Sequence, residues 1–427
     1  MQETVKMPYG KTRLTFTAPK GATIEILESK RCRNLPNAQL TLRKSLEKPL
    51  RTQPLSEIAC GRKSACIVIS DITRPVPNLL ILGEILPILE KAGIPREKTT
   101  ILIGTGTHRA APVAEVRTLV GADTACRYRV VSHDCNRGNV RIGEITNPIC
   151  RTKIPLEIDR LYVEADLKIL TGLVEPHIFC GYSGGRKAIL PGIASLGSIR
   201  RWHCPEIVAH RKSTPGVLQG NVAHRLTSRA AGIVAADFCV NVTLNRMREI
   251  TGVFAGGVEQ VFEAAVAKVE SYVLTQPVAP AKVIVTSAAG WPLDLTFYQA
   301  IKGLVAVLPV FAKGGVVVLA AKCDEGLGDA LFESLIRCTK DVTTWSRKLR
   351  SWSKFQLGQW QWQRMGWTRE RGRVFLVSAM SDADARAGFC EPFQNLQTAV
   401  EAALRETRSN RILVVPEGPY VVTRAAR

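Results

Sequence analysis

Short apolar runs rich in β-branched residues recur along the chain, and each one ends in a turn. They are too uniformly apolar for a sheet with one face in water, so they predict strands buried on both sides. Stretches of helical periodicity lie between them, for example at 78–92 and 258–272. Alternating strands and helices predict an α/β fold with parallel or mixed sheets. The expected strands are 65–70, 100–104, 167–172, 282–286, 315–320, 374–378 and 411–415.

A proline-containing segment divides this pattern into two parts. Residues 271–280 contain two prolines, follow a long expected helix and precede a new strand, which is typical of a linker. We therefore expect two α/β domains, one of residues 1–272 and one of residues 273–427. No apolar run approaches the roughly 18 residues of a membrane helix, and the first residues lack a signal-peptide pattern. These features predict a cytoplasmic protein without a membrane partner.

Charge changes this picture in one region. The formal net charge is +21, and residues 337–373 hold ten Lys or Arg and five of the seven tryptophans. Basic residues interleaved with aromatic ones are typical of nucleic-acid-binding surfaces. The same pattern describes an amphipathic helical surface that packs on a sheet or closes over an acidic substrate. No signature of a known nucleic-acid-binding fold accompanies it, so the sequence does not favour a nucleic-acid partner.

The candidate chemistry gathers where the histidines lie. All six occur between residues 108 and 224, and His108, His177 and His203 stand in or beside turns with charged neighbours. Histidine exchanges its proton near neutral pH and is the commonest nitrogen ligand for metals. Polar loops also follow three expected strands, at 71–75, 104–108 and 175–177. Because ligands of open α/β sheets bind beyond the carboxyl ends of the strands, we expect these loops to converge on one cleft.

Two of these loops suggest how a ligand is held. In the first, an Asp71–Arg74 contact would fix a guanidinium for a planar carboxylate or phosphate. The alternative is a helix start that is capped by Asp71 or Thr73. In the second, Gly104 and Gly106 are expected to let the backbone approach a ligand while His108 points into the cleft.

The segment after 175–177 combines glycines with a lysine. The turn of Ser183, Gly184 and Gly185 would offer backbone N–H groups to a phosphate, with Lys187 projecting over it. A Pro-Gly break at 191–192 would let Lys187 and His203 face one ligand from different elements.

Two further pairs stay open on spacing alone. His203 and His210 are two helical turns apart, and a single metal ligand is favoured over joint ligation by both. Gln299 and Lys302 share a helix face and offer an amide and a cation, although a solvated helix start explains them equally well.

Taken together, these segments resemble the nickel-pincer-nucleotide racemases and epimerases, the lactate racemase family. The resemblance implies two α/β domains with the active site in the interdomain cleft. The N-terminal domain would hold the cofactor and the catalytic histidines, and the C-terminal domain would close over the substrate. The matching segments are 71–75, 104–108, 175–177, 183–187 with 191–192, His203, 298–303 and 416–420.

The resemblance also implies a role for individual residues. Lys187 would be joined covalently to the cofactor, a pyridinium thioamide/thiocarboxylate mononucleotide, and His203 would be the protein ligand of nickel. His108 and His177 would be the paired general bases, and Asp71 would orient Arg74. The other implied cofactor-binding residues are Asp71, Thr73, Ser183, Gly184 and Gly185. The implied substrate-binding residues are Arg74, Tyr298, Gln299 and Lys302.

This resemblance implies inversion of a small-molecule 2-hydroxy acid. One histidine would take the hydroxyl proton while hydride leaves to the cofactor, and two histidines on opposite sides would serve the two enantiomers. Planar sulfur, carbon and imidazole donors suit Ni(II). Other proteins must make the cofactor, so cofactor-biosynthesis proteins are the implied partners.

The resemblance breaks at 355–362, where lactate-specific members carry a Gly-x-His-Lys element. The bulky replacement predicts a substrate larger or more acidic than lactate. Trp360 and Gln361 are then candidate pocket residues, although places in the core and on the surface of a helix explain them as well.

Two alternatives from other classes explain single regions. A zinc-dependent hydrolase would use His203 and His210. A polyanion or nucleic-acid binder would use 337–373, and its binding would depend on salt. The racemase interpretation is favoured because it explains the histidines, Lys187 and Arg74 together.

Overall fold

The computed structural model describes residues 3–349 and 355–426, which divide into two units. The middle unit comprises Arg31–Ser271, and the terminal unit combines Met1–Lys30 with Tyr272–Arg427. The expected first domain of 1–272 therefore differs from the middle unit at its beginning. Its first thirty residues belong with the C-terminal part of the chain, because β3 (Thr23–Ile26) pairs in parallel with β18 (Arg411–Val415).

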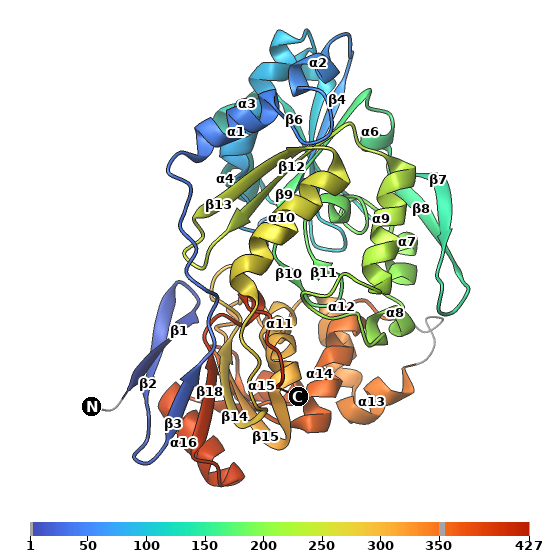
Figure 1. Ribbon diagram of the computed structural model, residues 1–427. Coiled ribbons are helices and arrows are strands. Elements are labelled where there is room, and N and C mark those ends of the chain that lie inside the picture. Colours follow the sequence, from blue (N-terminus) through green and yellow to red (C-terminus); the bar gives the residue numbers. More distant parts are fainter. Residues whose placement is uncertain (1–2, 350–354, 427) are drawn as a thin grey trace. The chain divides into compact units, whose positions relative to one another are not determined.

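A six-stranded sheet of order β13-β12-β9-β4-β5-β6 is the centre of the middle unit. Its neighbouring strands are parallel except for β13, which runs antiparallel to β12. Helices α1 to α4 bury apolar side chains on one face, while α6 and the short 3-10 helix η2 contact the other (Figure 1). The strands are β4 (Ala65–Ser70), β5 (Thr99–Gly104), β6 (Arg129–Ser132), β9 (Leu167–Leu173), β12 (Phe238–Leu244) and β13 (Ile250–Gly256).

Helices and two small hairpins complete the middle unit. The helices are α1 (Ala38–Glu47), α2 (Leu55–Ala59), α3 (Asn78–Lys91), α4 (Val113–Val120), α5 (Ala122–Arg127), α6 (Arg160–Val163), η2 (Gly185–Ala188), α7 (Leu196–Trp202), α8 (Pro205–Ala209), α9 (Val222–Val234) and α10 (Val258–Val273). The hairpins pair β7 (Asn139–Thr146) with β8 (Lys153–Asp159), and β10 (Pro176–His177) with β11 (Gly181–Tyr182).

The terminal unit is built on an entirely parallel sheet of order β17-β16-β15-β14-β18-β3. On one face, α16 and the hairpin β1–β2 bury apolar side chains against it, and α11 and α14 contact the other face. The strands are β1 (Thr4–Tyr9), β2 (Thr12–Thr17), β14 (Ala281–Ser287), β15 (Phe311–Ala320), β16 (Gly372–Val377) and β17 (Glu391–Phe393). The helices are α11 (Phe297–Val307), α12 (Ala330–Cys338), α13 (Val342–Lys348), α14 (Gln359–Arg371), α15 (Asp382–Ala387) and α16 (Leu396–Thr407).

These elements confirm the predicted α/β class with parallel and mixed sheets. Every strand expected from an apolar run is present, although β15 starts four residues earlier than the expected 315–320. The expected linker at 271–280 is not structureless, because α10 extends to Val273, and Leu274 and Val278 bridge to the C-terminal residues Val422 and Ala425. None of the helices in the described ranges has the length and apolar character that a bilayer-spanning segment requires.

Candidate active site

The three polar loops leave neighbouring strands at one edge of the middle sheet. Strand β4 pairs in parallel with both β5 and β9, so residues 71–75, 104–108 and 174–177 follow adjacent carboxyl ends. The order of the strands along the sheet reverses between β4 and β9. Ligands of open α/β sheets bind at such a reversal. Contacts of Asp71 with His108 and of Arg74 with Glu175 join the three loops, as the sequence predicted.

His108 is held by a buried carboxylate. Its Nδ1 lies 2.6 Å from Asp71 Oδ2, and the hydroxyl of Thr73 donates to Asp71 Oδ1 at 2.6 Å. Burial opposes ionisation of Asp71, but His108, Arg74 and Thr73 outweigh it and lower its pKa to about 2. The ionised carboxylate keeps a proton on Nδ1 of His108, so Nε2 of the neutral ring has the lone pair of a base.

Arg74 pairs with Glu175 rather than with Asp71. Its Nε lies 3.3 Å from Glu175 Oε1, and its Nη1 donates to the carbonyl and the hydroxyl of Thr73 at 3.1 and 3.3 Å. The expectation that Asp71 orients Arg74 by direct contact is therefore wrong. The side chain of Asp71 turns instead to His108 and Thr73, which are closer donors. Glu175 was quoted in a motif, but its role was missed because the pairing joins two loops distant in sequence.

His177 is held the opposite way round from His108. The backbone N–H groups of Cys180 and Phe179 donate to its Nδ1 at 3.1 and 3.5 Å. A ring nitrogen that accepts a hydrogen bond has no proton, so the neutral ring of His177 has its proton on Nε2. The short hairpin β10–β11 fixes this arrangement, because His177 pairs with Gly181 across it.

An aromatic cluster brings His177 and His203 together. The ring of Phe179 lies 5.0 Å from that of His177, 5.0 Å from that of Trp202 and 5.3 Å from that of His203, centre to centre. Trp202 and His203 pack edge to face at 4.6 Å. Phe179 and Trp202 are fully buried, so both histidines stand on an apolar, rigid support. Phe179 was not among the site residues predicted from the sequence.

His203 has the features of a metal-binding imidazole. It caps α7, and its Nδ1 donates to the carbonyl of Ile199 at 3.0 Å. The proton on Nδ1 places the lone pair on Nε2, and such a backbone hydrogen bond is the usual support of a metal-bound histidine. Burial lowers its pKa to about 3, so the ring is neutral at physiological pH, as a ligand must be.

Lys187 lies on η2, which packs on the sheet opposite α1 to α4. Its Nζ is 5.2 Å from the centre of the ring of Trp202, the residue that precedes His203. Burial lowers its pKa to about 8, so an appreciable fraction of the amine is neutral and nucleophilic near neutral pH. Lys187 and His203 therefore belong to one region, as the sequence predicted.

The glycines of the two loops serve close packing of the chain itself. Gly106 has a φ of +58° and donates its N–H to the carbonyl of Gly192 at 2.9 Å. This loop therefore lies against residues 191–192, which follow Lys187 in the chain, and its approach to a ligand stays a prediction. Gly184 has a φ of +83°, and a Cβ there would lie 2.6 Å from Val174.

The expected phosphate groups also have protein partners. The hydroxyl of Ser183 donates to the carbonyl of Leu173 at 2.8 Å. The N–H of Gly185 donates to Asn241 Oδ1 at 3.2 Å. Contact of Ser183, Gly184 and Gly185 with a nucleotide phosphate stays a prediction.

A buried histidine missed by sequence analysis supports the same region. His133 lies with Nδ1 2.7 Å from Asp159 Oδ2 and Nε2 3.0 Å from the carbonyl of Ala194. This bridge holds the segment that follows the turn of Lys187. The role of His133 could not be predicted from the sequence, because its partners Asp159 and Ala194 are 26 and 61 residues away along the chain.

The remaining expected substrate residues lie in the terminal unit. Tyr298, Gln299 and Lys302 occupy the first turns of α11. Trp360, at the start of α14, is buried and donates its Nε1–H to the hydroxyl of Tyr298 at 2.8 Å. Gln299 is also buried, and its Oε1 has no hydrogen-bond partner among the described residues. Roles in substrate binding stay predictions for all four.

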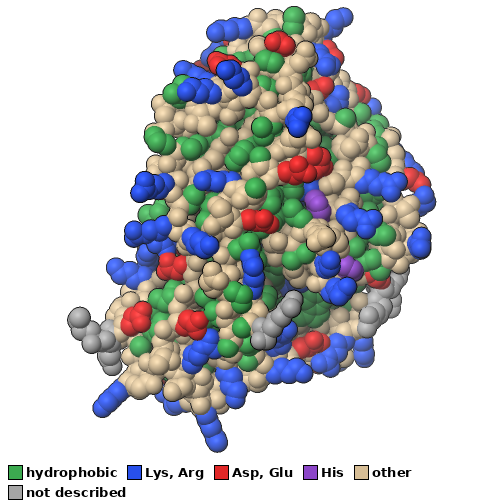
Figure 2. Space-filling model, viewed as in Figure 1, with side chains coloured by type: hydrophobic (Ala, Val, Ile, Leu, Met, Phe, Trp, Pro, Cys, Tyr) green, Lys and Arg blue, Asp and Glu red, His purple; other side chains and the backbone are tan. Residues whose placement is uncertain are grey.

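The basic segment 337–373 is largely folded into α12, α13 and α14. Arg337 pairs with Glu333 and Asp384, Arg347 pairs with Glu370, and Arg371 donates to backbone carbonyls. Arg350, Trp352 and Lys354 lie outside the described residues. Figure 2 shows Lys and Arg side chains spread over the visible face rather than confined to a single patch. The expectation that this segment has no nucleic-acid partner stays a prediction.

The zinc-hydrolase alternative also lacks support within the described residues. The one group there of three or more His, Cys, Asp or Glu close enough to share a metal ion is Cys150, Cys204 and Glu206. Neither His203 nor His210 belongs to it. The imidazole Nδ1 of His210 instead accepts the N–H of Lys212 at 3.3 Å.

Known proteins resemble the chain over nearly its whole length. The family models of the lactate racemase N-terminal and C-terminal domains match residues 9–216 and 276–423. The chain belongs to the lactate racemase family. It is 33% identical to a lactate racemase of Thermoanaerobacterium thermosaccharolyticum over 98% of this chain and 99% of the relative. Identity to a lactate racemase of Lactiplantibacillus plantarum is 30% over 92% of each chain.

Solved structures agree with this membership. The apoprotein structure of the Thermoanaerobacterium thermosaccharolyticum lactate racemase matches with a TM-score of 0.90 and 32% identity, covering 99% of this chain and 100% of that one. A protein from Thermotoga maritima matches with a TM-score of 0.72 over 93% of this chain, and at 19% identity it shows the fold alone. Family membership makes this protein an isomerase of the racemase class.

Proposed function

We propose that this protein inverts the hydroxyl-bearing carbon of a 2-hydroxy acid, using a nickel-pincer nucleotide as cofactor. The observation on which the proposal depends is the connected set of side chains at the strand-order reversal of the middle unit. His108, Arg74 and His177 leave adjacent strand ends, and His177 shares the aromatic cluster with His203. A proton acceptor, an anion-binding guanidinium and a metal-binding imidazole are what this reaction requires.

The side chains present fit this cofactor. His203 presents a neutral imidazole that is fixed through Nδ1, which suits a nickel ligand. Lys187 presents a partly neutral amine near Trp202, which suits a covalent link to the thioamide arm. When bound, the cofactor supplies an acceptor and donor of hydride at an electron-poor ring carbon.

The protein's own groups move the proton and hold the substrate. His108, with its lone pair on Nε2, accepts the hydroxyl proton of one enantiomer. The neutral His177, with its proton on Nε2, donates a hydrogen bond to the oxygen. As an imidazolium it returns a proton to the oxygen when the other enantiomer forms and is left neutral. Each turnover leaves His108 protonated and His177 neutral, and proton exchange with solvent restores both rings before the next turnover. Arg74, which is held by Glu175, binds the carboxylate of the substrate.

The substrate class follows from two considerations. Relatives named lactate racemase make lactate the first substrate to test. The departure from the lactate-specific pattern at 355–362 favours a larger or more acidic 2-hydroxy acid. Tyr298, Gln299 and Lys302 are the proposed additional substrate contacts. The remaining implied cofactor contacts, those of Asp71, Thr73, Ser183, Gly184 and Gly185, belong to the same proposal, as do the cofactor-biosynthesis proteins as partners.

The experiment is to co-express the chain with cofactor-making proteins and to measure its intact mass, nickel content and interconversion of chiral 2-hydroxy acids. We expect an adduct on Lys187, nearly one nickel per chain and racemisation of at least one substrate. His108→Ala and His177→Ala should each retain the adduct and lose activity by about 10²- to 10⁴-fold. An unmodified Lys187 in a nickel-free chain would refute the cofactor assignment, and full activity of both histidine variants would refute the two-base assignment.

A further inference from the structure

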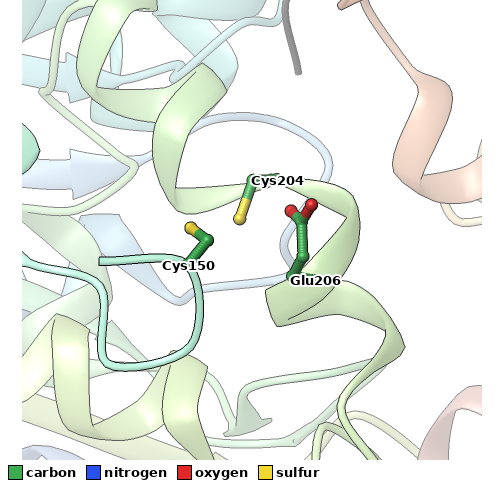
Figure 3. A group of neighbouring side chains, drawn as sticks. All are labelled: Cys150, Cys204 and Glu206. Atoms are coloured by element: carbon green, nitrogen blue, oxygen red, sulfur yellow. The ribbon is translucent and has the colours of Figure 1, made fainter. Parts of the chain in front are cut away.

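Two thiols and a carboxylate outside the proposed catalytic set converge in the middle unit. Cys150 lies in the loop between β7 and β8, Cys204 caps the N-terminus of α8, and Glu206 lies in the first turn of that helix. One ligand atom from each lies within 4.8 Å of the other two. Figure 3 shows the three side chains close together, one from the loop and two from the start of α8.

The surroundings of this cluster favour a bound cation. Glu206 Oε2 is buried and has no hydrogen-bond partner among the described residues. A buried carboxylate oxygen without a donor is costly, and a cation removes that cost. Both sulfur atoms also have polar neighbours, since Asn147 Nδ2 donates to Cys204 Sγ at 3.3 Å and Thr152 Oγ1 lies 3.1 Å from Cys150 Sγ. Such outer contacts typically orient the ligands of a metal ion.

The loop that presents Cys150 is held in place before any ligand arrives. Asn147 is fully buried, and its Oδ1 accepts the N–H of Ile149 at 2.9 Å. Its own backbone N–H and carbonyl pair with Thr152 and Arg151 at 2.9 and 3.0 Å. Asn147 therefore shapes the loop and contacts Cys204 at the same time, which sets the two thiols opposite each other. A site built this way loses little entropy on binding a cation.

We propose that Cys150, Cys204 and Glu206 bind a thiophilic divalent cation, zinc in the first instance, at a site separate from His203. Two thiolates and one carboxylate suit zinc, and three protein ligands leave its fourth tetrahedral position for water. Both thiols bind as thiolates and release their protons to solvent. The cation ties the β7–β8 loop to the turn that follows His203, so it supports the segment in which that histidine lies.

Zinc retention by the full chain tests the proposal independently of the racemase reaction. The protein is made without cofactor-making proteins, reduced, supplied with zinc and dialysed, and its zinc is then counted. We expect one zinc per chain in the wild type and in His203→Ala. Cys150→Ser and Glu206→Gln should bind zinc at least about 100-fold more weakly. Cys126→Ser, which alters an exposed thiol on α5, is the matched control and should retain the metal.

Spectroscopy of the wild type covers the case in which a variant fails to fold. X-ray absorption at the zinc edge should show two sulfur neighbours with lighter oxygen neighbours, and cobalt should give a thiolate charge-transfer band. Absence of retained zinc from the reduced wild type would overturn the proposal. Loss of zinc from His203→Ala with retention by Cys150→Ser would also overturn it. An X-ray absorption spectrum with imidazole but no sulfur neighbours would have the same meaning.

Discussion

His108 and His177 have their ring protons on opposite nitrogens, and the protein fixes this difference through the partner of Nδ1. A carboxylate faces Nδ1 of His108, whereas backbone N–H groups face Nδ1 of His177. One neutral ring is thus ready to accept a proton through Nε2, and the other donates a hydrogen bond through Nε2. Two bases that serve opposite enantiomers start each turnover in different protonation states. His177 therefore takes up a second proton before it acts as the acid, since a neutral imidazole that lost its proton would become an anion.

Asp71→Asn tests the fixed proton of His108. The amide cannot stabilise the imidazolium that forms when His108 takes the substrate proton, so we expect kcat/KM to fall by about 10²- to 10⁴-fold. The equilibrium constant between enantiomers is one, so the loss must be equal in both directions. Racemisation followed from each pure enantiomer measures it, with the Lys187 adduct mass as the check on cofactor loading. Asp123→Asn, which removes a charge on α5, should leave both rates unchanged, and a wild-type rate in Asp71→Asn would contradict the role.

Lys187→Met tests the cost of burying an amine. Burial lowers the pKa of Lys187 from 10.5 to about 8, so between these values the unfolded chain binds a proton that the folded chain does not. Below pH 8 both states are protonated and the folded state is penalised in full; as pH rises from 8 to 10.5 the penalty disappears. We expect the cofactor-free variant to be more stable than the wild type by about 1 to 2 kcal/mol at pH 7 and by little at pH 10. Urea unfolding at both pH values measures the difference in the free energy of unfolding between variant and wild type. A variant that is less stable than the wild type at pH 7 would show that the amine has stabilising partners.

At the scale of elements, the turn that carries Lys187 depends on close approach of its own backbone. A Cβ at Gly192 would lie 2.3 Å from the carbonyl oxygen of Ala188, so Gly192→Ala must displace that turn. We expect a loss of about 1 to 3 kcal/mol in the free energy of unfolding, with less Lys187 adduct after co-expression. Gly83, inside α3, has open space around it, so Gly83→Ala is the matched control and should stabilise by about 0.5 to 1 kcal/mol. Equal effects of the two substitutions would rule out the packing argument.

Local sequence predicted the elements whose pattern is simple. The fully buried run of β4 was predicted to the residue, and α3 to within one residue. β12 was missed because buried Asn241 and Thr243 interrupt its apolar pattern, and β7 because most of it is at least partly exposed. The loops of the site were predicted because carboxyl-end loops follow from strand order. The pairing of the side chains could not be predicted. Asp71 and His108 are 37 residues apart, and both Asp71 and Glu175 were possible partners of Arg74.

At the scale of the whole molecule, the excess of positive charge is spread over many local contacts. Arg373 pairs with Glu391 and Glu406, and Arg411 pairs with Glu25 and donates to backbone carbonyls. Partly exposed pairs of this kind each stabilise the fold by about 0 to 1 kcal/mol, so stability does not explain why the chain is so basic. The physical consequence of the net charge of +21 is a long-range field, which raises the local concentration of anions such as 2-hydroxy acids and weakens with added salt.

Removal of residues 1–30 tests whether the two ends of the chain form one unit. Val5, Met7 and Phe16 of the first hairpin are buried in the same cluster as α16, and β3 covers the edge of β18. We expect the shortened chain to exchange the backbone hydrogens of β18 and α16 at least about tenfold faster, while those of β4 and β5 in the middle unit keep their protection. Hydrogen exchange followed by mass spectrometry resolves these peptides separately.

Phe16→Ala in the full chain removes one buried ring and should lower the free energy of unfolding by about 3 to 5 kcal/mol. Hydrogen exchange should then become faster in the same peptides, those of β18 and α16. Acceleration confined to residues next to the cut would show that the hairpin is an appendage, because a shared core must transmit its loss to every element that packs on it.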